Sequence, residues 1–147
     1  MRPALTLSVV IVILDQASKA WLIGWVQDQG GWQQITGFFN LVMVWNRGIS
    51  FGMLQSGDTG RWLLVLFSSL VCLGLGFWLR RQSRRWPSYA LGAVIGGALG
   101  NIIDRVWRGA VADFFDFHLL GYHWPAFNIA DSAITIGVAM LLYDSFH

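Results

Sequence analysis

The sequence is short of charge and of cysteine, and each shortage excludes a class of protein. Charged residues make up 12% of its 147 positions and hydrophobic ones 55%, with a mean hydropathy of +0.52. A soluble domain carries about 25% charged residues, so the composition indicates a membrane protein. The single cysteine, Cys72, excludes an intrachain disulfide and a CxxC metal site.

Metal ligands and nucleic-acid motifs are scarce as well. The three histidines, His118, His123 and His147, show no ligand spacing, so we expect neither a metal nor another cofactor. The net charge is only +2, and the basic residues gather in one loop beside apolar segments. This pattern indicates membrane topology rather than nucleic-acid binding.

Long apolar segments take the place of the short stripes of a soluble core. A helix that crosses the hydrocarbon core needs roughly 17–25 residues, and four segments approach this length: 3–25, 62–79, 89–106 and 128–143. The first resembles a signal peptide, but no small-residue cleavage site follows it, so we interpret it as a retained span. We predict a mainly α membrane protein, a four-transmembrane-helix bundle that forms a single domain over residues 1–147.

The orientation follows from the run Arg80-Arg81-Gln82-Ser83-Arg84-Arg85, the densest positive cluster in the chain. Positive loops stay in the cytoplasm, which places both termini there and makes 26–61 and 107–127 the outer connections. Within the first of these, residues 35–53 are rich in Phe, Val, Ile and Trp with glycine punctuation, which predicts a small extracytoplasmic β-region of two or three strands. In the third span, Gly92, Gly96 and Gly100 form a stripe that lets another helix approach closely.

Two aspartates near the outer membrane boundary are the main candidates for chemistry. A carboxylate near a bilayer is costly unless it faces a protein interior or a watery cavity. Asp113 lies in a mostly apolar segment after the third span, and Asp131 lies in the first turn of the fourth. Asp131 also has a structural explanation, as residue N3 of a helix capped by Asn128.

A pair of adjacent carboxylates supports a definite mechanism. Two negative charges a few ångströms apart do not both ionise readily, so the pair shares one proton. The ionised member then takes a proton from an attacking water, and the protonated member donates to the carbonyl oxygen and later to the leaving nitrogen. Other polar residues fall in the outer half of the bundle: Asp15 and Lys19, which neutralise one another at i and i+4, and Asn101, Asp104 and Arg105.

Five segments in order resemble the lipoprotein signal peptidases, the bacterial signal peptidase II family. They are Asp15-Gln16-Ala17-Ser18-Lys19, Asn46-Arg47-Gly48-Ile49-Ser50-Phe51, Gly96 to Arg105, Val111-Ala112-Asp113-Phe114, and Phe127-Asn128-Ile129-Ala130-Asp131-Ser132. The resemblance covers most of the chain from Asp15 onward. It implies a multi-pass aspartyl endopeptidase of the bacterial cytoplasmic (inner) membrane, with its active site near the outer leaflet and a β-cradle outside.

The resemblance also implies a substrate and a set of site residues. Such enzymes remove the signal peptide of a diacylglyceryl-modified prolipoprotein just before the lipidated cysteine; we expect this one to act as a monomer among membrane lipids. Asp113 and Asp131 match the catalytic pair. The supporting or substrate-binding positions are matched by Asp15, Lys19, Asn46, Gly48, Asn101, Asp104, Arg105, Asn128 and Ala130.

Some alternatives remain at the level of sequence. Asp104 is the rival for the pair, although its neighbour Arg105 gives it an ion-pair explanation, and we predict Asp116 to be a solvated loop residue. A small membrane transporter or proton-relay protein would use Asp15, Asp104 and Asp131 as an ion pathway, but the chain has no inverted repeat and its acids gather at one face. A purely structural scaffold explains the glycines and leaves the acids unexplained.

Overall fold

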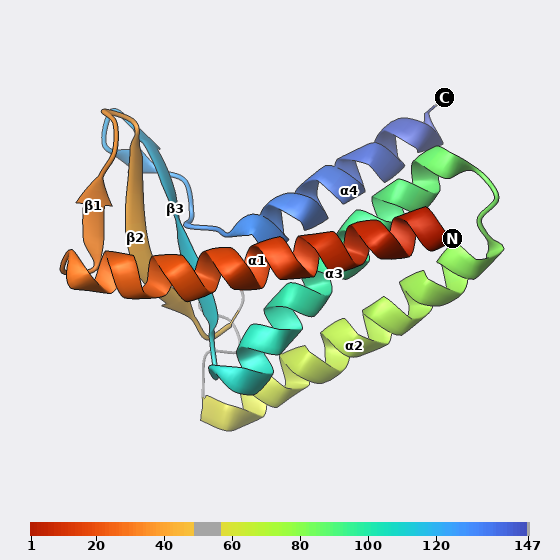
Figure 1. Cartoon of the computed structure of the whole chain (residues 1–147), viewed down its shortest axis with the longest axis horizontal. Helices are drawn as coiled ribbons and strands as arrows, with labels where there is room; N and C mark the ends of the chain where they lie inside the picture. The colour runs from red at the N-terminus through yellow and green to blue at the C-terminus, as the bar shows by residue number, and fades with distance from the viewer. Residues whose placement is uncertain (49–56, 147) are drawn as a thin grey trace.

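In the computed structural model, four helices lie side by side and a small sheet covers one end of them (Figure 1). The structure describes residues 1–48 and 57–146. The helices are α1 (Arg2–Asp28), α2 (Gly57–Arg81), α3 (Arg85–Trp107) and α4 (Ile129–Ser145). The predicted spans 3–25, 62–79 and 89–106 lie wholly within α1, α2 and α3, which are longer than predicted at both ends. The predicted span 128–143 lies within α4 except for residue 128, which precedes the helix. Both termini and the α2–α3 connection lie at the end opposite the sheet.

Helix α3 is the centre of the bundle, because it packs against all three of the other helices. Its glycines permit this. A Cβ on Gly92 would lie 2.5 Å from the carbonyl oxygen of Ala4, and one on Gly96 would lie 2.9 Å from Cα of Ser8. Ser8 uses the close approach to donate its hydroxyl to the Gly92 carbonyl at 2.6 Å. The predicted role of the glycine stripe in helix approach is therefore confirmed.

The outward faces of the helices are apolar. Large exposed side chains on them include Val9, Ile13, Leu66, Phe67, Leu70 and Leu142. A contiguous apolar surface of this kind marks a membrane or partner contact. Among the helices of the described residues, α1 and α2 are long and apolar enough to cross a membrane by themselves; α4, with 17 residues, is the shortest of the four.

The sheet is larger than the sequence predicts. Its antiparallel strands follow the order β1 (Trp32–Gln34), β2 (Phe39–Asn46), β3 (Val111–Leu119) and β4 (Tyr122–His123). The predicted β-region, 35–53, supplies β2; its residues 49–53 lie outside the described part of the chain. Strands β1, β3 and β4 lie outside the predicted region: β1 comes just before it, and β3 and β4 come from the second outer connection. The sheet therefore joins both connections, and β3 brings Asp113 to the helix ends.

Candidate active site

Asp113 and Asp131 come together through one residue, Asn128. The side-chain amide of Asn128 donates to Oδ1 of Asp113 at 2.8 Å, and its backbone N–H donates to Oδ2 of Asp131 at 3.4 Å. A second asparagine holds each carboxylate from another element. Asn46 at the end of β2 donates to Oδ2 of Asp113 at 3.2 Å, and Asn101 of α3 donates to Oδ1 of Asp131 at 2.8 Å. Three asparagines from different parts of the chain thus fix the two carboxylates.

Local structure explains how each aspartate reaches this place. Asn128 caps α4 and forms a capping box with Asp131, so the predicted capping role of both residues is confirmed. Asp113 lies on β3 opposite Val44 of β2. Just beyond it, Phe115 and Phe127 form an antiparallel bridge, which holds the segment before α4 against β3. Asn128 therefore caps α4 and directly follows the residue that pairs with β3, so it links the position of Asp131 to that of Asp113.

Burial and charge alter the proton affinity of Asp113. Its side chain is 2% exposed. Burial, followed by the negative charge of Asp131, raises the pKa of Asp113 to about 7, although hydrogen bonds from Asn46 and Asn128 and the charge of Lys19 act in the opposite direction. Asp113 therefore holds a proton at neutral pH far more readily than an ordinary aspartate, which is the behaviour of a carboxylate pair that shares one proton.

Asp15, Lys19 and Asp104 form a buried ionic cluster beside the pair. The ammonium of Lys19 lies 2.7 Å from Asp15 and 2.9 Å from Asp104, and none of the three side chains is exposed. The predicted Asp15–Lys19 pairing is confirmed. The predicted Asp104–Arg105 pair is wrong: Asp104 binds Lys19 and, at 2.6 Å, Arg108. Arg108 lies one helical turn after Asp104, so their side chains share a face of α3 and those of neighbours do not.

The ionic cluster holds the residue before each aspartate of the pair. Oδ1 of Asp15 accepts the backbone N–H of Ala130 at 3.0 Å, and Oδ2 of Asp104 accepts that of Ala112 at 3.1 Å. Oδ2 of Asp104 also binds Lys19 and its Oδ1 binds Arg108, so both oxygens are engaged and neither is free for a rival catalytic role.

The other predicted residues lie at the edge of this arrangement. Gly48 donates its N–H to the side-chain oxygen of Asn46 at 3.0 Å and so orients that asparagine toward Asp113. The guanidinium of Arg105 is in electrostatic range of Asp131, Asp113 and Asp104, and its buried Nε has no hydrogen-bond partner among the described residues. Arg105 thus supplies positive charge and a free donor next to the pair.

Two residues that bind the ionic cluster, Gln16 and Arg108, were not among the predicted site residues. Gln16 donates to both Asp15 and Asp104 at 3.1 and 3.0 Å and accepts from Arg108 at 2.9 Å. The spacing of Arg108 four residues after Asp104 was the available signal. Gln16 lies within the first family segment, Asp15 to Lys19, but its contacts could not be predicted from the sequence because they depend on how α1 packs against α3.

A groove of about 730 Å³ opens beside Asp131. The segment Trp124 to Phe127 forms one wall, and Ser132, Thr135 and Ile136 of α4 form the other. The hydroxyl of Ser132 donates to the carbonyl of the capping residue Asn128 at 3.0 Å, and that of Thr135 donates to the carbonyl of Asp131 at 2.9 Å. Both walls are therefore effectively apolar, and Asp131 supplies the charged group.

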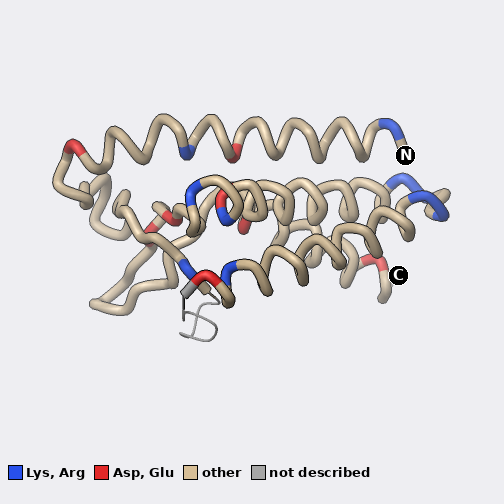
Figure 2. The backbone as a smooth tube through the Cα atoms, turned by 90° about the horizontal axis from the view of Figure 1, so that it is seen from below, with Lys and Arg blue, Asp and Glu red and all other residues tan. Residues whose placement is uncertain are grey.

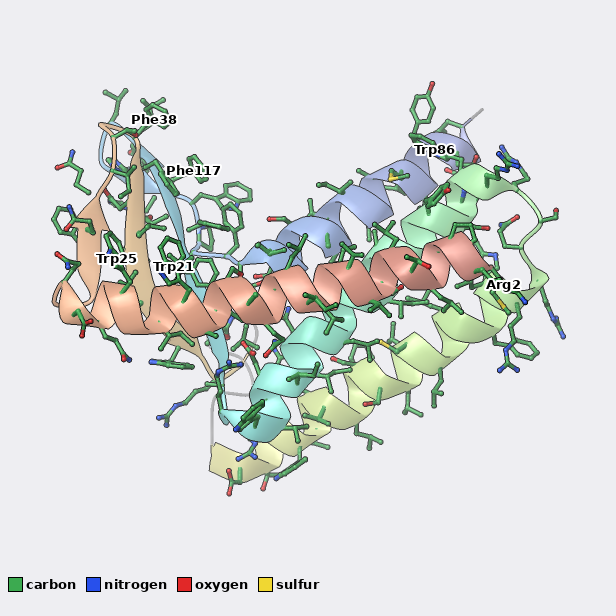
Figure 3. The ribbon with its side chains drawn as sticks, viewed as in Figure 1. Arg2, Trp21, Trp25, Phe38, Trp86 and Phe117 are labelled. Atoms are coloured by element: carbon green, nitrogen blue, oxygen red, sulfur yellow. The ribbon has the colours of Figure 1, made fainter. Side chains whose placement is uncertain are left out.

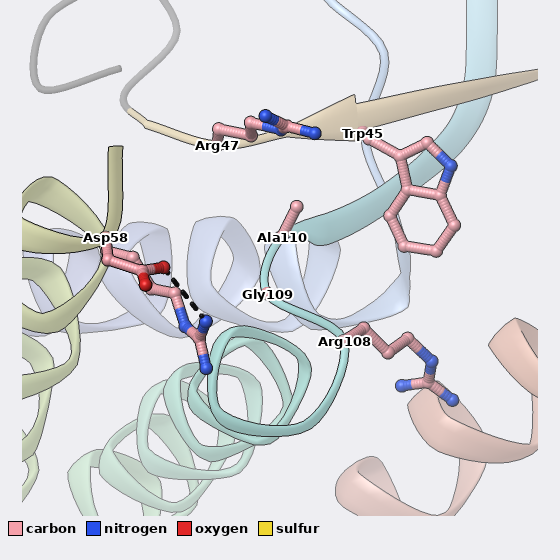
Figure 4. Close-up of a pocket in the computed structure, with 7 residues that line it drawn as sticks. Trp45, Arg47, Asp58, Arg108, Gly109 and Ala110 are labelled. Carbon is pink, nitrogen blue, oxygen red and sulfur yellow. Dashed lines mark hydrogen bonds and ion pairs between the residues drawn. The ribbon is translucent and has the colours of Figure 1, made fainter. Parts of the chain in front are cut away.

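A second pocket, of about 420 Å³, lies between the end of β2 and the facing ends of α2 and α3 (Figure 4). Arg47, Asp58 and Arg61 line it, and Arg61 pairs with Asp58 at 3.3 Å. The Arg108 side chain points away toward α1 and binds Asp104 of α3 and Gln16 of α1. This pocket contains neither aspartate of the pair. No group of three or more metal-ligating side chains occurs within residues 1–48 and 57–146.

Comparison with solved structures gives the class of protein first. The chain is similar to two proteins described as bacterial membrane enzymes. One, solved at 1.9 Å resolution, matches with a TM-score of 0.84 and 31% identity over 98% of this chain and 92% of that one. The other, at 2.3 Å, matches with a TM-score of 0.83 and 28% identity over 99% and 88%. The fold with its interior carboxylates is therefore that of a bacterial membrane enzyme.

Sequence comparison gives the family. The family model described as "Signal peptidase (SPase) II" matches residues 7–147. A lipoprotein signal peptidase of Caulobacter vibrioides is 47% identical over 97% of this chain and 86% of its own length, and one of Rhodopseudomonas palustris is 42% identical over 99% and 92%. The chain belongs to the signal peptidase II family of aspartic-type peptidases, which cleave the signal peptides of prolipoproteins. This membership favours the peptidase over the transporter alternative.

Proposed function

We propose that Asp113 and Asp131 are the catalytic pair with which this signal peptidase II hydrolyses a peptide bond of a diacylglyceryl-modified prolipoprotein, just before the lipidated cysteine. The observation that carries the proposal is Asn128, which binds both carboxylates at once. A single residue between two interior acids keeps them close enough to share a proton, and the raised pKa of Asp113 supports that sharing.

The two acids have different roles in the reaction. Asp113 is the member that carries the shared proton, because its pKa is about 7, well above that of an ordinary aspartate. Asp131 lies in the first turn of α4, where the helix dipole favours negative charge, so it is the ionised member. Asp131 takes a proton from water as the water oxygen attacks the carbonyl carbon. Asp113 donates its proton to the carbonyl oxygen, which gives a tetrahedral intermediate with two hydroxyls. As the C–N bond breaks, the proton on Asp131 passes to the leaving nitrogen of the cysteine, and one hydroxyl of the intermediate returns a proton to Asp113.

The apolar groove beside Asp131 supports a lipid-modified substrate. An extended peptide needs donors for its carbonyls as well as acceptors for its amides, and the hydroxyls of Ser132 and Thr135 already give their hydrogens to backbone carbonyls. A hydrocarbon chain needs none and gains roughly 0.8 kcal/mol per buried CH₂. The groove continues onto Ile136, an exposed residue of the apolar face of α4. An acyl chain of the substrate can therefore remain in lipid while its cysteine reaches the pair.

We also propose that all four helices span the membrane, with both termini in the cytoplasm and the sheet outside. At 1.5 Å per residue, the 17 residues of α4 extend about 26 Å, which nearly matches a hydrocarbon core of about 30 Å. Arg2 and the arginines at the α2–α3 connection, Arg80, Arg81, Arg84 and Arg85, lie at the end that carries the termini, and Figure 2 shows basic positions there, as cytoplasmic loops require. Trp21 and Trp25 lie near the sheet and Trp86 at the opposite end (Figure 3), which fits two interfacial belts.

The proposed enzyme is one domain and one chain. The pair and its supporting residues come from α1, β2, α3, β3 and α4. Elements from both ends of the chain thus build one site, which supports a single domain. Because a single chain supplies all of these groups, a monomer suffices. The expected site is the outer end of the bundle in the bacterial inner membrane, where a secreted prolipoprotein first exposes its cysteine.

The test is cleavage of a diacylglyceryl-modified precursor peptide by purified protein in bilayers. We expect Asp113→Asn and Asp131→Asn each to abolish cleavage while the thermal unfolding of the variant stays cooperative. Asp144→Asn is the matched control, because Asp144 is also in an ion pair, with Arg84, but lies at the opposite end of the bundle. Full activity in either active-site variant would remove that residue from the pair, and an unmodified precursor cleaved equally well would contradict the lipid requirement.

A further inference from the structure

Asp116 is a buried carboxylate that the proposed reaction does not use. The prediction that it is a solvated loop residue is wrong, because β3 continues through it and its exposed fraction is 6%. Asn40 of β2 donates to Oδ2 of Asp116 at 2.9 Å, and Nδ1 of His123 on β4 lies 2.8 Å from Oδ1 and 3.0 Å from Oδ2. Asp116 therefore joins three adjacent strands through side chains.

The contact with His123 has a defined polarity. Burial raises the pKa of Asp116, but hydrogen bonds from His123 and Asn40 and the nearby charge of His123 and His118 outweigh it and hold the pKa below its ordinary value. Asp116 is thus ionised near neutral pH and only accepts hydrogen bonds. His123 must then carry its proton on Nδ1, and the ring of His118 stacks on the His123 ring at 4.9 Å between centroids.

The chain that follows His123 leads directly to the catalytic pair. The N–H of Trp124 donates to the carbonyl of Phe117 at 2.8 Å, and Phe127 exchanges two backbone hydrogen bonds with Phe115, at 2.9 and 3.2 Å. The segment from His123 to Phe127 is therefore hydrogen-bonded to β3 near both of its ends. Its next residue is Asn128, whose amide reaches Asp113.

The turn before His123 makes this attachment necessary. Leu120 and Gly121 connect β3 to β4, and both have positive φ values, 51° and 82°. Leucine in that region is strained, and β4 pairs with β3 through only two residue pairs. So short and strained a hairpin is marginal by itself. A charge-assisted hydrogen bond at its base is the strongest contact that the described residues offer to hold it.

We infer that Asp116 and His123 are positioning residues for catalysis, which fasten the segment 123–127 to β3 and thereby keep Asn128 within hydrogen-bond reach of Asp113. This inference rests on the proposed role of Asp113. Neither residue touches the reacting atoms; both act through Asn128. A displacement of about 1 Å at a reacting group costs up to a hundredfold in rate, so loosening the segment affects turnover more than substrate binding.

The first experiment separates kcat from KM. We expect His123→Ala and Asp116→Ala each to lower kcat by about tenfold to a hundredfold and to change KM less than about twofold. The double variant should be no slower than the slower single variant, because both changes release the same segment. His123→Asn, whose side-chain amide places a donor where Nδ1 lies, should recover most of the rate. Asp144→Asn again serves as the distant ion-pair control.

The pH dependence of kcat provides a second test, because a simple loss of stability does not change the pKa of Asp113. The hydrogen bond from Asn128 lowers the pKa of Asp113, against burial and the charge of Asp131 and together with Asn46 and Lys19. Weakening that bond raises the pKa of Asp113. The alkaline limb, the fall in kcat as Asp113 loses its proton, should therefore shift to higher pH in His123→Ala and lie at the wild-type pH in His123→Asn.

The outcomes distinguish this inference from the proposed function. If Asp113→Asn is inactive while His123→Ala keeps both the rate and the alkaline limb of the unmodified enzyme, the positioning role is wrong and the pair stands. A drop in rate that merely follows the fraction of folded protein, with the limb unmoved, also overturns the positioning role. Activity retained in Asp113→Asn removes the pair itself, whatever the His123 variants do.

Discussion

Oδ1 of Asp15 accepts a hydrogen bond from the backbone N–H of Ala130 at 3.0 Å, across 115 positions of sequence. The contact joins α1 to the first turn of α4, at the residue before Asp131. The first N–H groups of a helix have no partner within it, so a buried carboxylate from another helix satisfies one of them. The same carboxylate is paired with Lys19, and the position of Asp131 therefore depends on an ion pair in α1.

Removing Lys19 should destabilise the whole bundle. Lys19→Met leaves Asp15 and Asp104 buried without their shared cation, and breaking a buried pair in this way costs about 3–5 kcal/mol. The measurement is thermal or denaturant unfolding in a fixed detergent. Asp144→Ala, which breaks the exposed Arg84–Asp144 pair, should cost no more than about 1 kcal/mol. Equal losses in the two variants would contradict a structural role for Lys19.

Activity should fall as the pH rises through neutrality. The reaction needs one proton on the pair, and Asp113, whose pKa is about 7, loses it above that value. We expect kcat to decline by about tenfold per pH unit beyond the limb, as seen in rates at saturating substrate between pH 5 and 9. A rate that stays flat to pH 9 would exclude Asp113 as the proton-bearing member.

Stability should depend on the same group, with a definite sign. The folded protein holds the Asp113 proton up to about pH 7, and an unfolded aspartate releases it near 3.8. Between these values the native state binds more protons, so wild-type stability decreases as the pH rises through this range. Asparagine cannot ionise, so the unfolding free energy of Asp113→Asn does not carry this pH dependence. The stability of the variant minus that of wild type should therefore be larger at pH 8 than at pH 4. Unfolding of both proteins at the two pH values measures the difference, and an advantage larger at pH 4 would contradict it.

The close contact of α3 with α4 should tolerate no added methyl group. A Cβ on Gly97 would meet the Ala130 carbonyl oxygen and Ile134, so Gly97→Ala displaces the start of α4. We expect a loss of about 1–3 kcal/mol in stability and reduced cleavage. Gly74→Ala is the matched control, because a Cβ there meets nothing within 4 Å. Unfolding and cleavage assays on both variants test the contact, and wild-type behaviour of Gly97→Ala would show that the helices separate freely.

The proposed topology is open to chemical labelling. In a Cys72→Ala background, a membrane-impermeant maleimide should modify Leu120→Cys in intact spheroplasts and should modify Ser83→Cys only after the cells are opened. Leu120 is 90% exposed at the β3–β4 turn, and Ser83 is exposed in the α2–α3 connection. Asp116 is unsuitable as an outer position because it is buried. The reverse pattern of labelling would invert the orientation.

The sequence predicted the pieces of the site better than their contacts. The spacing of Asn128 and Asp131 predicted a helix start, and the glycines of α3 predicted a close helix contact. Both predictions depend on residues only a few positions apart. The choice of Arg105 as the partner of Asp104 failed because that pair was inferred from adjacency, whereas side chains meet at i and i+4. Asp116 failed because its burial depends on β2 and β4, which lie beside it only after the sheet forms.

By itself, the sequence determined the membrane class, the four helical segments, the family motifs and the two aspartates that we propose as the pair, because hydropathy, capping and motif spacing are local properties of the chain. Only the tertiary structure decided that Asn128 lies between those aspartates, that Asp15 and Asp104 hold the residues next to them, and that Asp116 is tied to His123. These contacts join segments far apart in sequence, and a hydrogen bond over such a separation exists only where packing brings donor and acceptor within about 3 Å.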